Sequence, residues 1–513
     1  MSKSRTRAGW MVFAVALCAV TLHAAVQPHP LFQHNMVLQR RCALPVWGTA
    51  LPGETVTVAF AAQRVRGVTD TQGVWRVRLA PQRVCTTPQT MIIAGSSRIE
   101  LTNILIGDVW VCSGQSNMEW PLEKGSNAAA EIAAAAQYPT LRLFTVARAT
   151  ALTPQTNLVG TWQVSSPETA AEFSAVATFF ARALIARRGV PIGLIHASWG
   201  GTPVESWTRR AVLEAFPFMT QRLRAADEAV RSYDPAAAQR QYERDLAIWQ
   251  TNAAALQALG QPAPWQPQLW DPSHNAWQPC SLYNAMIAPL LPFALRGVIW
   301  YQGEANAWNA DQYCVLFPAM IEDWRAQWGC GAFPFLFVQL ANFLERQTAP
   351  VQTNASWPLL REAQAMTLRV TNTAMASAVD IGDANDIHPR NKQEVGRRLA
   401  LAARALGDGE PLVYAGPLFR DLRIVGSNMI MRFTNGGGGL VAKGGALKGF
   451  AVCGADTNWV WATAVIRGAT VVATAPGGAR PVAIRLAICT TKTVCQPHPS
   501  ARTSKSSVFT KSK

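Results

Sequence analysis

The chain has 513 residues, of which 49% are hydrophobic and 15% are charged, so it can bury a large core and is too long for one ordinary domain. This composition excludes general disorder, and a single apolar run of near-membrane length, close to the N-terminus, excludes a multi-span membrane protein. The formal net charge of +16 comes from scattered basic residues without a dense Lys/Arg block, which favours solubility or loose attraction to anionic surfaces over a nucleic-acid partner.

The N-terminus has the pattern of an export signal. Basic residues within the first seven positions precede an apolar run over residues 10–20, and Ala24 and Ala25 supply small residues near a cleavage point. A membrane anchor is the alternative, and it is disfavoured because the run is short for a span. We therefore expect residues 1–25 to be a cleaved signal peptide. The mature protein should be exported, periplasmic or extracellular, without stable membrane association.

Residues 26–104 have the pattern of a small β-sandwich. Short β-rich runs are separated by turn signals such as Pro52-Gly53 and Gln72-Gly73. No acid, base or nucleophile is clustered in this stretch, so we expect a structural or ancillary domain.

Residues 105–412 alternate between strand-like and helix-like runs, which predicts an α/β domain with a mostly parallel sheet covered by helices on both faces. Helical periodicity is seen over residues 170–187 and 392–406. In such sheets the chemistry gathers at the carboxyl ends of the strands. The strand-like runs cover residues 104–111, 192–197, 297–301, 335–340 and 375–381.

Residues of about 209–275 interrupt this alternation with a charged, Ala-rich helical part and then a Pro- and Trp-rich part. Two interpretations stay open: an insertion that rims or covers a cleft, and a solvated helical hairpin with no functional part.

The pattern of short strands returns over residues 413–485 and predicts a C-terminal β-rich unit. Residues 486–513 are rich in Thr, Ser, Lys and Pro, and we expect a disordered basic tail there.

Ser116 is the first candidate for chemistry. It follows the strand-like run that ends near Val111, in the segment CSGQSNMEW, and a serine on a tight turn beyond a parallel strand is well placed as a nucleophile. Gly114 allows close backbone approach, and the Ser116 amide could donate to an oxyanion. The alternative is a serine that merely caps a turn, which is common.

Two further polar segments follow predicted strands. WYQGEANA carries Gln302 and Glu304, an amide and a carboxylate suited to oxyanion donation and to orienting a base. SWGGTPVESW carries Gly200 and Gly201, whose amides could face a ligand. Each segment could instead be a polar strand end or a simple turn.

The segment DIGDANDIHP supplies the candidate base. Histidine is scarce, with seven in the chain, and His388 stands beside a carboxylate in a strand-end loop. A serine hydroxyl is a poor nucleophile until a base takes its proton, and that base must be held in one tautomer by a third group. Asp386 and Asp383 are both near enough in sequence for that task. An exposed histidine before a helix is the alternative.

Four blocks stand in order along the chain, and their letters are GQSNMEWPL, SWGGTPVESW, WYQGEANA and DIHPRNKQEVGRRLAL. Together they resemble the sialate O-acetylesterase family of the SGNH hydrolase superfamily, and the likeness runs from about residue 29 to about residue 485. The resemblance implies a flavodoxin-like SGNH hydrolase core, a parallel sheet between helices, with flanking β-rich domains. It also implies a serine esterase that removes O-acetyl groups from sugars, sialic acids in particular, without a metal or a cofactor.

Carried over by position, the resemblance makes Ser116 the nucleophile and His388 the general base. The third member of the triad is open, because the position three residues before the histidine is Asn385; Asp386 ranks first and Glu304 second. The expected oxyanion and substrate-binding groups are the Ser116 amide, Gly200 or Gly201, Gln302, Gln115 and Asn117.

Two rival functions stay open. One is an acetylesterase of xylan or another polysaccharide, and the other is a carbohydrate-binding protein whose catalytic site has decayed. Ten of the nineteen tryptophans lie between Trp199 and Trp328, near the motif segments, and flat aromatic faces suit sugar rings. Because large aromatic side chains also fill cores, we expect only a minority of them to contact ligand.

Overall fold

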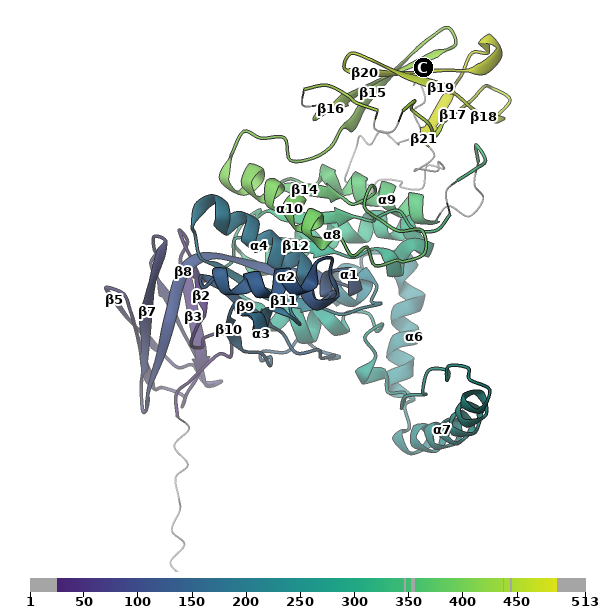
Figure 1. The fold of residues 1–513 in the computed structure, drawn as a ribbon. Helices are drawn as coiled ribbons and strands as arrows, with labels where there is room; N and C mark the ends of the chain where they lie inside the picture. Colours follow the sequence, from purple (N-terminus) through teal and green to yellow (C-terminus); the bar gives the residue numbers. More distant parts are fainter. Residues whose placement is uncertain (1–24, 346, 352–355, 437, 443–444, 487–513) are drawn as a thin grey trace, which may run out of the picture.

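The computed structural model describes residues 25–345, 347–351, 356–436, 438–442 and 445–486 (Figure 1). The predicted signal peptide, apart from its last residue, and nearly all of the predicted tail lie outside the described residues. In the part of the chain that the structure describes, no helix combines the length and hydropathy needed to cross a membrane.

The N-terminal region is a β unit made of two sheets. One sheet has the order β1-β3-β6, and the strands of the other extend the central sheet of the molecule. Alternating burial along β4 and β6 shows that each has one face toward the core. The strands are β1 (Gln27–Pro28), β2 (Val37–Gln39), β3 (Leu44–Thr49), β4 (Thr55–Phe60), β5 (Gln63–Val68), β6 (Val74–Leu79) and β7 (Cys85–Ala94).

The long strand β8 (Arg98–Gly114) joins this unit to the central sheet. Its first half pairs antiparallel with β7, and its second half pairs parallel with two central strands. The boundary expected at residue 104 therefore falls inside one continuous strand. The buried side chains of both regions also form a single hydrophobic cluster.

The central sheet has the order β10-β9-β11-β8-β12-β13-β14. All neighbours are parallel except β10, which pairs antiparallel with β9 at the edge. Every residue of β11 and β12 is buried, as expected for strands covered on both faces. The expected α/β architecture with a mostly parallel sheet is confirmed. The strands are β9 (Leu141–Thr145), β10 (Trp162–Val164), β11 (Ile192–Ser198), β12 (Gly297–Tyr301), β13 (Phe335–Gln339) and β14 (Thr373–Ser377).

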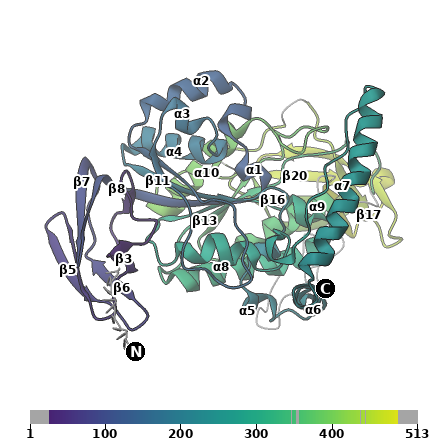
Figure 2. The ribbon, with the colours of Figure 1, turned by 90° about the horizontal axis from the view of Figure 1, so that it is seen from below.

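Four helices cover this sheet: α4 (Ala175–Arg188), α8 (Ala310–Trp328), α9 (Ser356–Met366) and α10 (Lys392–Ala402). Figure 2 shows α4 and α10 on one side of the strands and α8 on the other. Ser174 and Asn391 cap the N-termini of α4 and α10 by accepting backbone N–H groups. Gly396 lets α10 approach α4 closely, because a Cβ there would lie 2.6 Å from the Cβ of Phe179.

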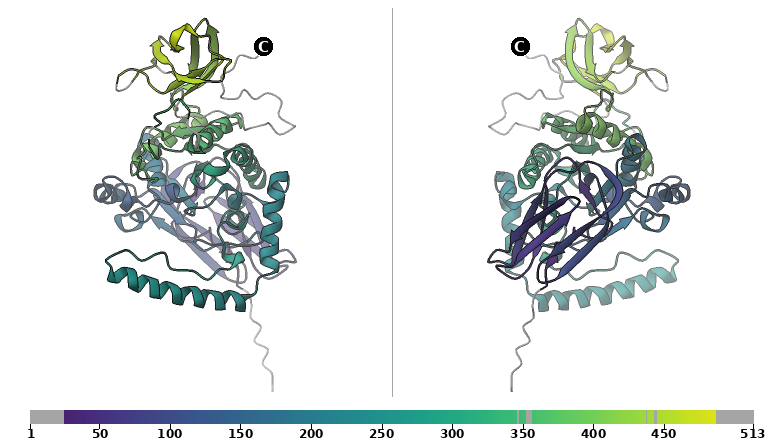
Figure 3. Two further views of the ribbon diagram at one scale, coloured as in Figure 1. Left: turned by 90° about the vertical axis from the view of Figure 1, so that its right-hand side faces the viewer. Right: turned by 90° about the vertical axis from the view of Figure 1, so that its left-hand side faces the viewer.

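The segment expected as a helical insertion contains α5 (Arg210–Leu213), α6 (Thr220–Arg231) and α7 (Pro235–Ala258). No residue of α7 is buried, and the helix projects from the body of the molecule (Figures 1 and 3). Three short helices, α1 (Ser116–Glu119), α2 (Ala128–Ala133) and α3 (Pro167–Ala170), lie in the first half of the chain.

The C-terminal β-rich region has two small antiparallel sheets, β15-β16-β20-β19 and β18-β17-β21. Met429, Val452 and Ile484 belong to a hydrophobic cluster of its own. Figure 3 shows this region at the opposite end of the molecule from α7. The strands are β15 (Leu418–Val425), β16 (Asn428–Thr434), β17 (Phe450–Cys453), β18 (Trp459–Trp461), β19 (Thr463–Arg467), β20 (Thr470–Thr474) and β21 (Ala483–Leu486).

Candidate active site

Three of the four sequence blocks leave the central sheet at one point. β8 lies between β11 and β12, and the register pairs Gly114, its last residue, with both Ser198 and Tyr301. Gly114 has a φ of 135°, and a Cβ there would overlap the carbonyl oxygen of Tyr301, so the position requires glycine. The carboxyl ends of three neighbouring strands therefore deliver their loops to the same edge, as the sequence predicted.

The structure brings Ser116 and His388 together across 272 residues of chain. Ser116 opens α1 directly after β8, and His388 lies in the loop between β14 and α10. The Oγ of Ser116 is 2.9 Å from the Nε2 of His388, which is hydrogen-bond distance. The ring of Trp120 stacks on the imidazole, with the centroids 4.9 Å apart and the planes at 21°. The imidazole is thereby held against the hydroxyl.

Asp386 is the carboxylate beside the histidine. Its Oδ1 accepts the backbone N–H of His388 at 2.8 Å and lies 3.7 Å from the Nδ1 of the ring. Asp383 is exposed and accepts the N–H of Asn385 instead. Glu304 points to another partner, since its Oε1 accepts the Nδ2 of Asn117 at 2.6 Å. Of the carboxylates considered from sequence, Asp386 is the one that forms an ion-pair contact with the imidazole, at a distance longer than a hydrogen bond.

A buried lysine lies behind the serine and the histidine. Lys392, in the first turn of α10, is fully buried, and its Nζ donates to the Oδ1 of Asn117. The Nδ2 of Asn117 also donates to the carbonyl of Ile387 at 3.0 Å. Sequence reasoning missed Lys392. The sequence feature that could have identified it is a lysine at the start of a predicted helix, where the helix dipole disfavours a positive charge.

Burial sets the protonation of these groups. It lowers the pKa of Lys392 to about 7 against the raising effect of Glu304 and Asp386. Burial also raises the pKa of Glu304, although hydrogen bonds and Lys392 act in the other direction. The pKa of His388 is lowered, first by burial and then by Lys392, while Asp386 raises it. The imidazole is thus biased toward the neutral form that a general base needs.

Gly200 lies against the serine on the other side. A Cβ at Gly200 would be 3.3 Å from the Cβ of Ser116, and the Gly200 N–H donates to the Oε2 of Glu119 at 2.8 Å. Gly201 has a φ of +75° and open space around it. The other oxygen of Glu119 accepts the Nε of Arg148 at 2.8 Å. Neither Glu119 nor Arg148 was singled out from sequence.

Gln302 does not have the role that the sequence suggested. It is fully buried, and its Nε2 donates to the Thr202 carbonyl at 3.2 Å and to the Oδ1 of Asn306 at 2.7 Å. Both amide protons are therefore occupied, and the side chain has none left for an oxyanion. Asn306, which the sequence analysis did not single out, also accepts the N–H of Val204 at 2.8 Å. Together these amides tie the loop after β12 to the loop after β11.

Gln115 has a similar structural position. Its side chain is buried, and its Oε1 accepts the N–H groups of Gly303 and Ala305 at 3.3 and 3.2 Å. Gly303 begins the turn that leads into the 3-10 helix η8 (Glu304–Asn309). Gln115 thus fixes the position of η8 relative to α1.

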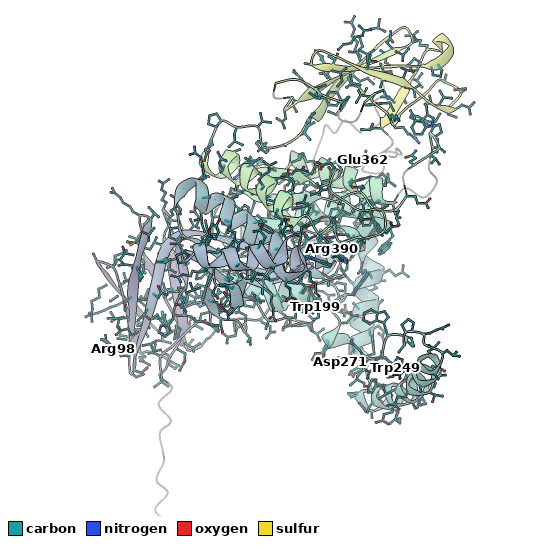
Figure 4. All side chains as sticks on the ribbon, in the orientation of Figure 1. Arg98, Trp199, Trp249, Asp271, Glu362 and Arg390 are labelled. Carbon is teal, nitrogen blue, oxygen red and sulfur yellow. The ribbon has the colours of Figure 1, made fainter. Side chains whose placement is uncertain are left out.

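The tryptophans lie both in the core and at the surface. Trp207, Trp300 and Trp324 are among the fully buried side chains, whereas Trp265 is 99% exposed on the segment after α7. Figure 4 shows Trp199 in the body of the molecule and Trp249 on the projecting α7. The guanidinium of Arg148 lies 5.6 Å from the ring centroid of Trp199. This cation–π pair is on the side of the site where Gly200 meets the serine.

The arrangement can support acyl transfer. A serine hydroxyl touches an imidazole nitrogen, a carboxylate lies beside the other nitrogen, and backbone N–H groups flank the serine. This is the minimum set for a hydroxyl that attacks a carbonyl carbon and a base that takes and returns its proton.

Comparisons with known proteins point to a family of carbohydrate esterases. A family model described as carbohydrate esterase, sialic acid-specific acetylesterase, matches residues 106–236 and 267–405, and thus leaves out most of α7. The sialate O-acetylesterases of mouse and human are each 31% identical to this chain; the alignments cover 78% of the chain and 77% and 75% of the relatives. A solved carbohydrate acetylesterase from Xanthomonas citri superposes with a TM-score of 0.75 at 36% identity, covering 91% of this chain and 94% of that one.

Proposed function

Because the chain belongs to the sialate O-acetylesterase family, we propose that it removes O-acetyl groups from sialic acids or related acetylated sugars through an acetyl-serine intermediate. The chain is a carboxylic ester hydrolase of that family, and its homologues support removal of O-acetyl groups from sugars. The observation that carries the mechanism is the 2.9 Å contact between Ser116 Oγ and His388 Nε2.

The reaction proceeds in two acyl-transfer steps. His388 Nε2 takes the Ser116 hydroxyl proton as Oγ attacks the acetyl carbonyl carbon. The imidazolium then returns that proton to the sugar oxygen as the ester C–O bond breaks, which releases the sugar alcohol and leaves acetyl-Ser116. Water, deprotonated by the same imidazole, attacks the acetyl-enzyme, and acetate leaves as Oγ regains a proton. Asp386 stabilises the imidazolium that forms in both steps.

Backbone N–H groups stabilise the oxyanion in this proposal. The Ser116 N–H lies at the start of α1, where the first amides have no partner within the helix. The Gly200 N–H already binds an anionic oxygen, that of Glu119, so its donor suits a negatively charged acceptor. The substrate oxyanion replaces that carboxylate oxygen. Gln302 is left out of this set because its amide protons are occupied.

The experiment compares Ser116→Ala with Ser113→Ala. Ser113 is a buried serine of β8 whose Oγ has no hydrogen-bond partner among the described residues, so its loss should be tolerated. Ser116→Ala should abolish acetate release from O-acetylated sialic acid and from p-nitrophenyl acetate, while Ser113→Ala keeps it. A serine-reactive phosphonate should label Ser116 by mass spectrometry. Acetate release at the wild-type rate by folded Ser116→Ala refutes the mechanism.

The substrate class has a competitor, because the Xanthomonas citri structure is described only as a carbohydrate acetylesterase. Comparing kcat/KM for O-acetylated sialic acid and for acetylated xylan separates a sialate esterase from a polysaccharide esterase. A carbohydrate-binding protein with a decayed site would release acetate from neither substrate, and the intact Ser116–His388 contact argues against it.

Two further expectations from the sequence stay proposals. We propose that the central sheet is the core of an SGNH hydrolase, supported by the parallel strands and by the serine directly after β8. We also propose export, supported by the basic start and the apolar run over residues 10–20. N-terminal sequencing of the mature protein tests the second, and a mature chain that begins at Met1 contradicts it.

A further inference from the structure

Lys392 is a buried cation that the proposed mechanism does not use. Its side chain is fully buried, and the residue lies four positions after His388 in the sequence. An ammonium group taken out of water is costly unless it is paired and hydrogen-bonded, so its presence next to the nucleophile needs a physical reason.

The lysine holds Asn117, which is adjacent to the nucleophile. The Nζ of Lys392 donates to the Oδ1 of Asn117, and the Nδ2 of Asn117 donates to the Glu304 carboxylate at 2.6 Å and to the Ile387 carbonyl at 3.0 Å. The cation on one side and the acceptors on the other fix the orientation of the amide. Since Ile387 precedes His388, this network links α1, η8 and the histidine loop.

The ammonium and the imidazole both contact the ring of Trp120. The ring of Trp120 stacks on His388 at 4.9 Å between centroids, and the Lys392 Nζ is 5.6 Å from the centroid of the same ring. The Nζ is 5.4 Å from the ring of Tyr301, so aromatic faces surround the cation. The positive charge of Lys392 disfavours a second positive charge on His388 and so lowers the pKa of the imidazole.

The charged and titratable neighbours of these two groups come from η8, from β12 and from the loop that carries His388. Glu304 and Asp386 face Lys392 and favour its protonated form, and the phenol of Tyr301 is kept neutral because burial raises its pKa well above the usual value. Asp386 favours the protonated form of His388, whereas burial and Lys392 lower its pKa. The pKa of Lys392 is about 7, so the ammonium is protonated in the more acidic range where the imidazole titrates.

We propose that Lys392 is a positioning residue of the esterase: through Asn117 it fixes Ser116 relative to the His388 loop, and its charge acts on the imidazole across the Trp120 ring that both groups contact. This inference rests on the proposed function. It assigns to the lysine two separable effects, one on the geometry of attack and one on the pH range of activity.

The experiment removes the charge in three ways. Lys392→Met keeps an unbranched stem, Lys392→Gln keeps an N–H that can bond Asn117, and the double variant Lys392→Met/Glu304→Gln removes both charges so that neither is left unpaired. Arg390→Gln is the control, because Arg390 is an exposed cation two residues after His388. Each variant is assayed for kcat/KM against pH with p-nitrophenyl acetate, and its fold is checked by circular dichroism.

Removing the ammonium should move the acid limb of the pH profile to higher pH, because the imidazole then accepts a proton more readily. The plateau value of kcat/KM should fall roughly tenfold to a hundredfold, as expected for a displacement of reacting groups by a fraction of an ångström to 1 Å. Lys392→Gln should lose less of the plateau rate than Lys392→Met, yet show the same shift of the limb. Arg390→Gln should keep the wild-type profile.

Folded variants with the wild-type acid limb and plateau rate overturn the proposal. So does the failure of all three charge-removing variants to fold, since that result assigns Lys392 to stability alone. If Ser116→Ala stays active, the proposed function itself is wrong. If Ser116→Ala is inactive and the limb does not move in folded Lys392 variants, only this inference is wrong.

Discussion

Replacing Gly200 by alanine tests how closely the backbone after β11 approaches Ser116, the proposed nucleophile. The φ of Gly200 lies outside the left-handed range, so alanine introduces no backbone strain there. Its Cβ would lie 3.0 Å from the Oε2 of Glu119 and 3.3 Å from the Cβ of Ser116. Both distances are shorter than ordinary carbon contacts, so one neighbour or the other has to move.

The size of the effect follows from which atoms can move. The Glu119 oxygen ends a flexible side chain and can rotate away, but the Cβ of Ser116 is attached to the start of α1 and can yield only if the backbone shifts. A shift of a few tenths of an ångström changes the approach of Oγ to the ester carbon. Since misplacement by 1 Å can cost about a hundredfold in rate, we expect kcat to fall by about tenfold. Stability should fall by only about 1 kcal/mol.

Gly201→Ala is the matched control, one residue further along. A Cβ at Gly201 meets no atom within 4 Å, but its φ of +75° is unfavourable for an L-residue. This variant should lose about 1–2 kcal/mol of stability and keep most of its kcat. Initial rates with p-nitrophenyl acetate and urea unfolding of both variants give the comparison. Wild-type kcat in Gly200→Ala, or equal loss of kcat in both variants, refutes the close approach of Gly200 to the serine.

Three further predictions concern charge and packing. Asp386→Asn should lower kcat by at least about a hundredfold and move the acid limb to lower pH, because Asp386 raises the pKa of His388; a pH–rate profile checks both. The pKa of Lys392 is about 7 in the folded state and near 10.5 in the unfolded chain, so above pH 7 the unfolded state binds more protons. The stability contributed by Lys392 therefore rises with pH from about 7, by at most about 1.4 kcal/mol per pH unit. Urea unfolding at several pH values between 7 and 8.5 should show that the free energy of unfolding rises less steeply with pH in Lys392→Met than in the wild type. Gly396→Ala should destabilise the protein by about 2 kcal/mol or more, measured by thermal unfolding, because its Cβ would meet the backbone nitrogen of Phe180 at 2.7 Å.

The central sheet was predictable because its strands are buried on both faces. Strands of that kind appear as unbroken apolar runs, and parallel strands end at a common edge, which is where the sequence placed its candidate residues. His388 was identified by its carboxylate neighbour in sequence, and that neighbour is the one the structure places beside the ring. These features depend on local pattern, which a single sequence contains.

The boundary expected at residue 104 coincides with a change of burial inside β8. Burial along β8 alternates up to Asn103 and is continuous afterwards, so the sequence pattern changes character within one strand. Asn103 itself has a φ of 58°, an irregular position in the middle of the strand. The change reflects a new environment for the strand, with one face covered and then two.

The hydrogen-bond partners of individual side chains could not be predicted from the sequence, for a different reason. Gln302 was placed at the correct strand end, but a strand pattern does not give the residues across the loop, and Asn306 and Thr202 take its two amide protons. The role of Lys392 likewise depends on Asn117, which is 275 residues away. Such contacts are set by how whole elements pack together.

Two of the carboxylates near Ser116 are each accompanied by a cation. Two carboxylates lie near Ser116, Glu119 at the Gly200 amide and Glu304 beyond Asn117, and each alone would oppose negative charge on the ester oxygen. Arg148 pairs directly with Glu119, and Lys392 faces Glu304 through the shared amide. Glu119 and Glu304 are thus each offset by a cation, so in the proposed mechanism the N–H dipoles beside Ser116, rather than a net negative charge, act on the oxyanion. Removing one cation should therefore slow acyl transfer even where the serine and its base stay in place.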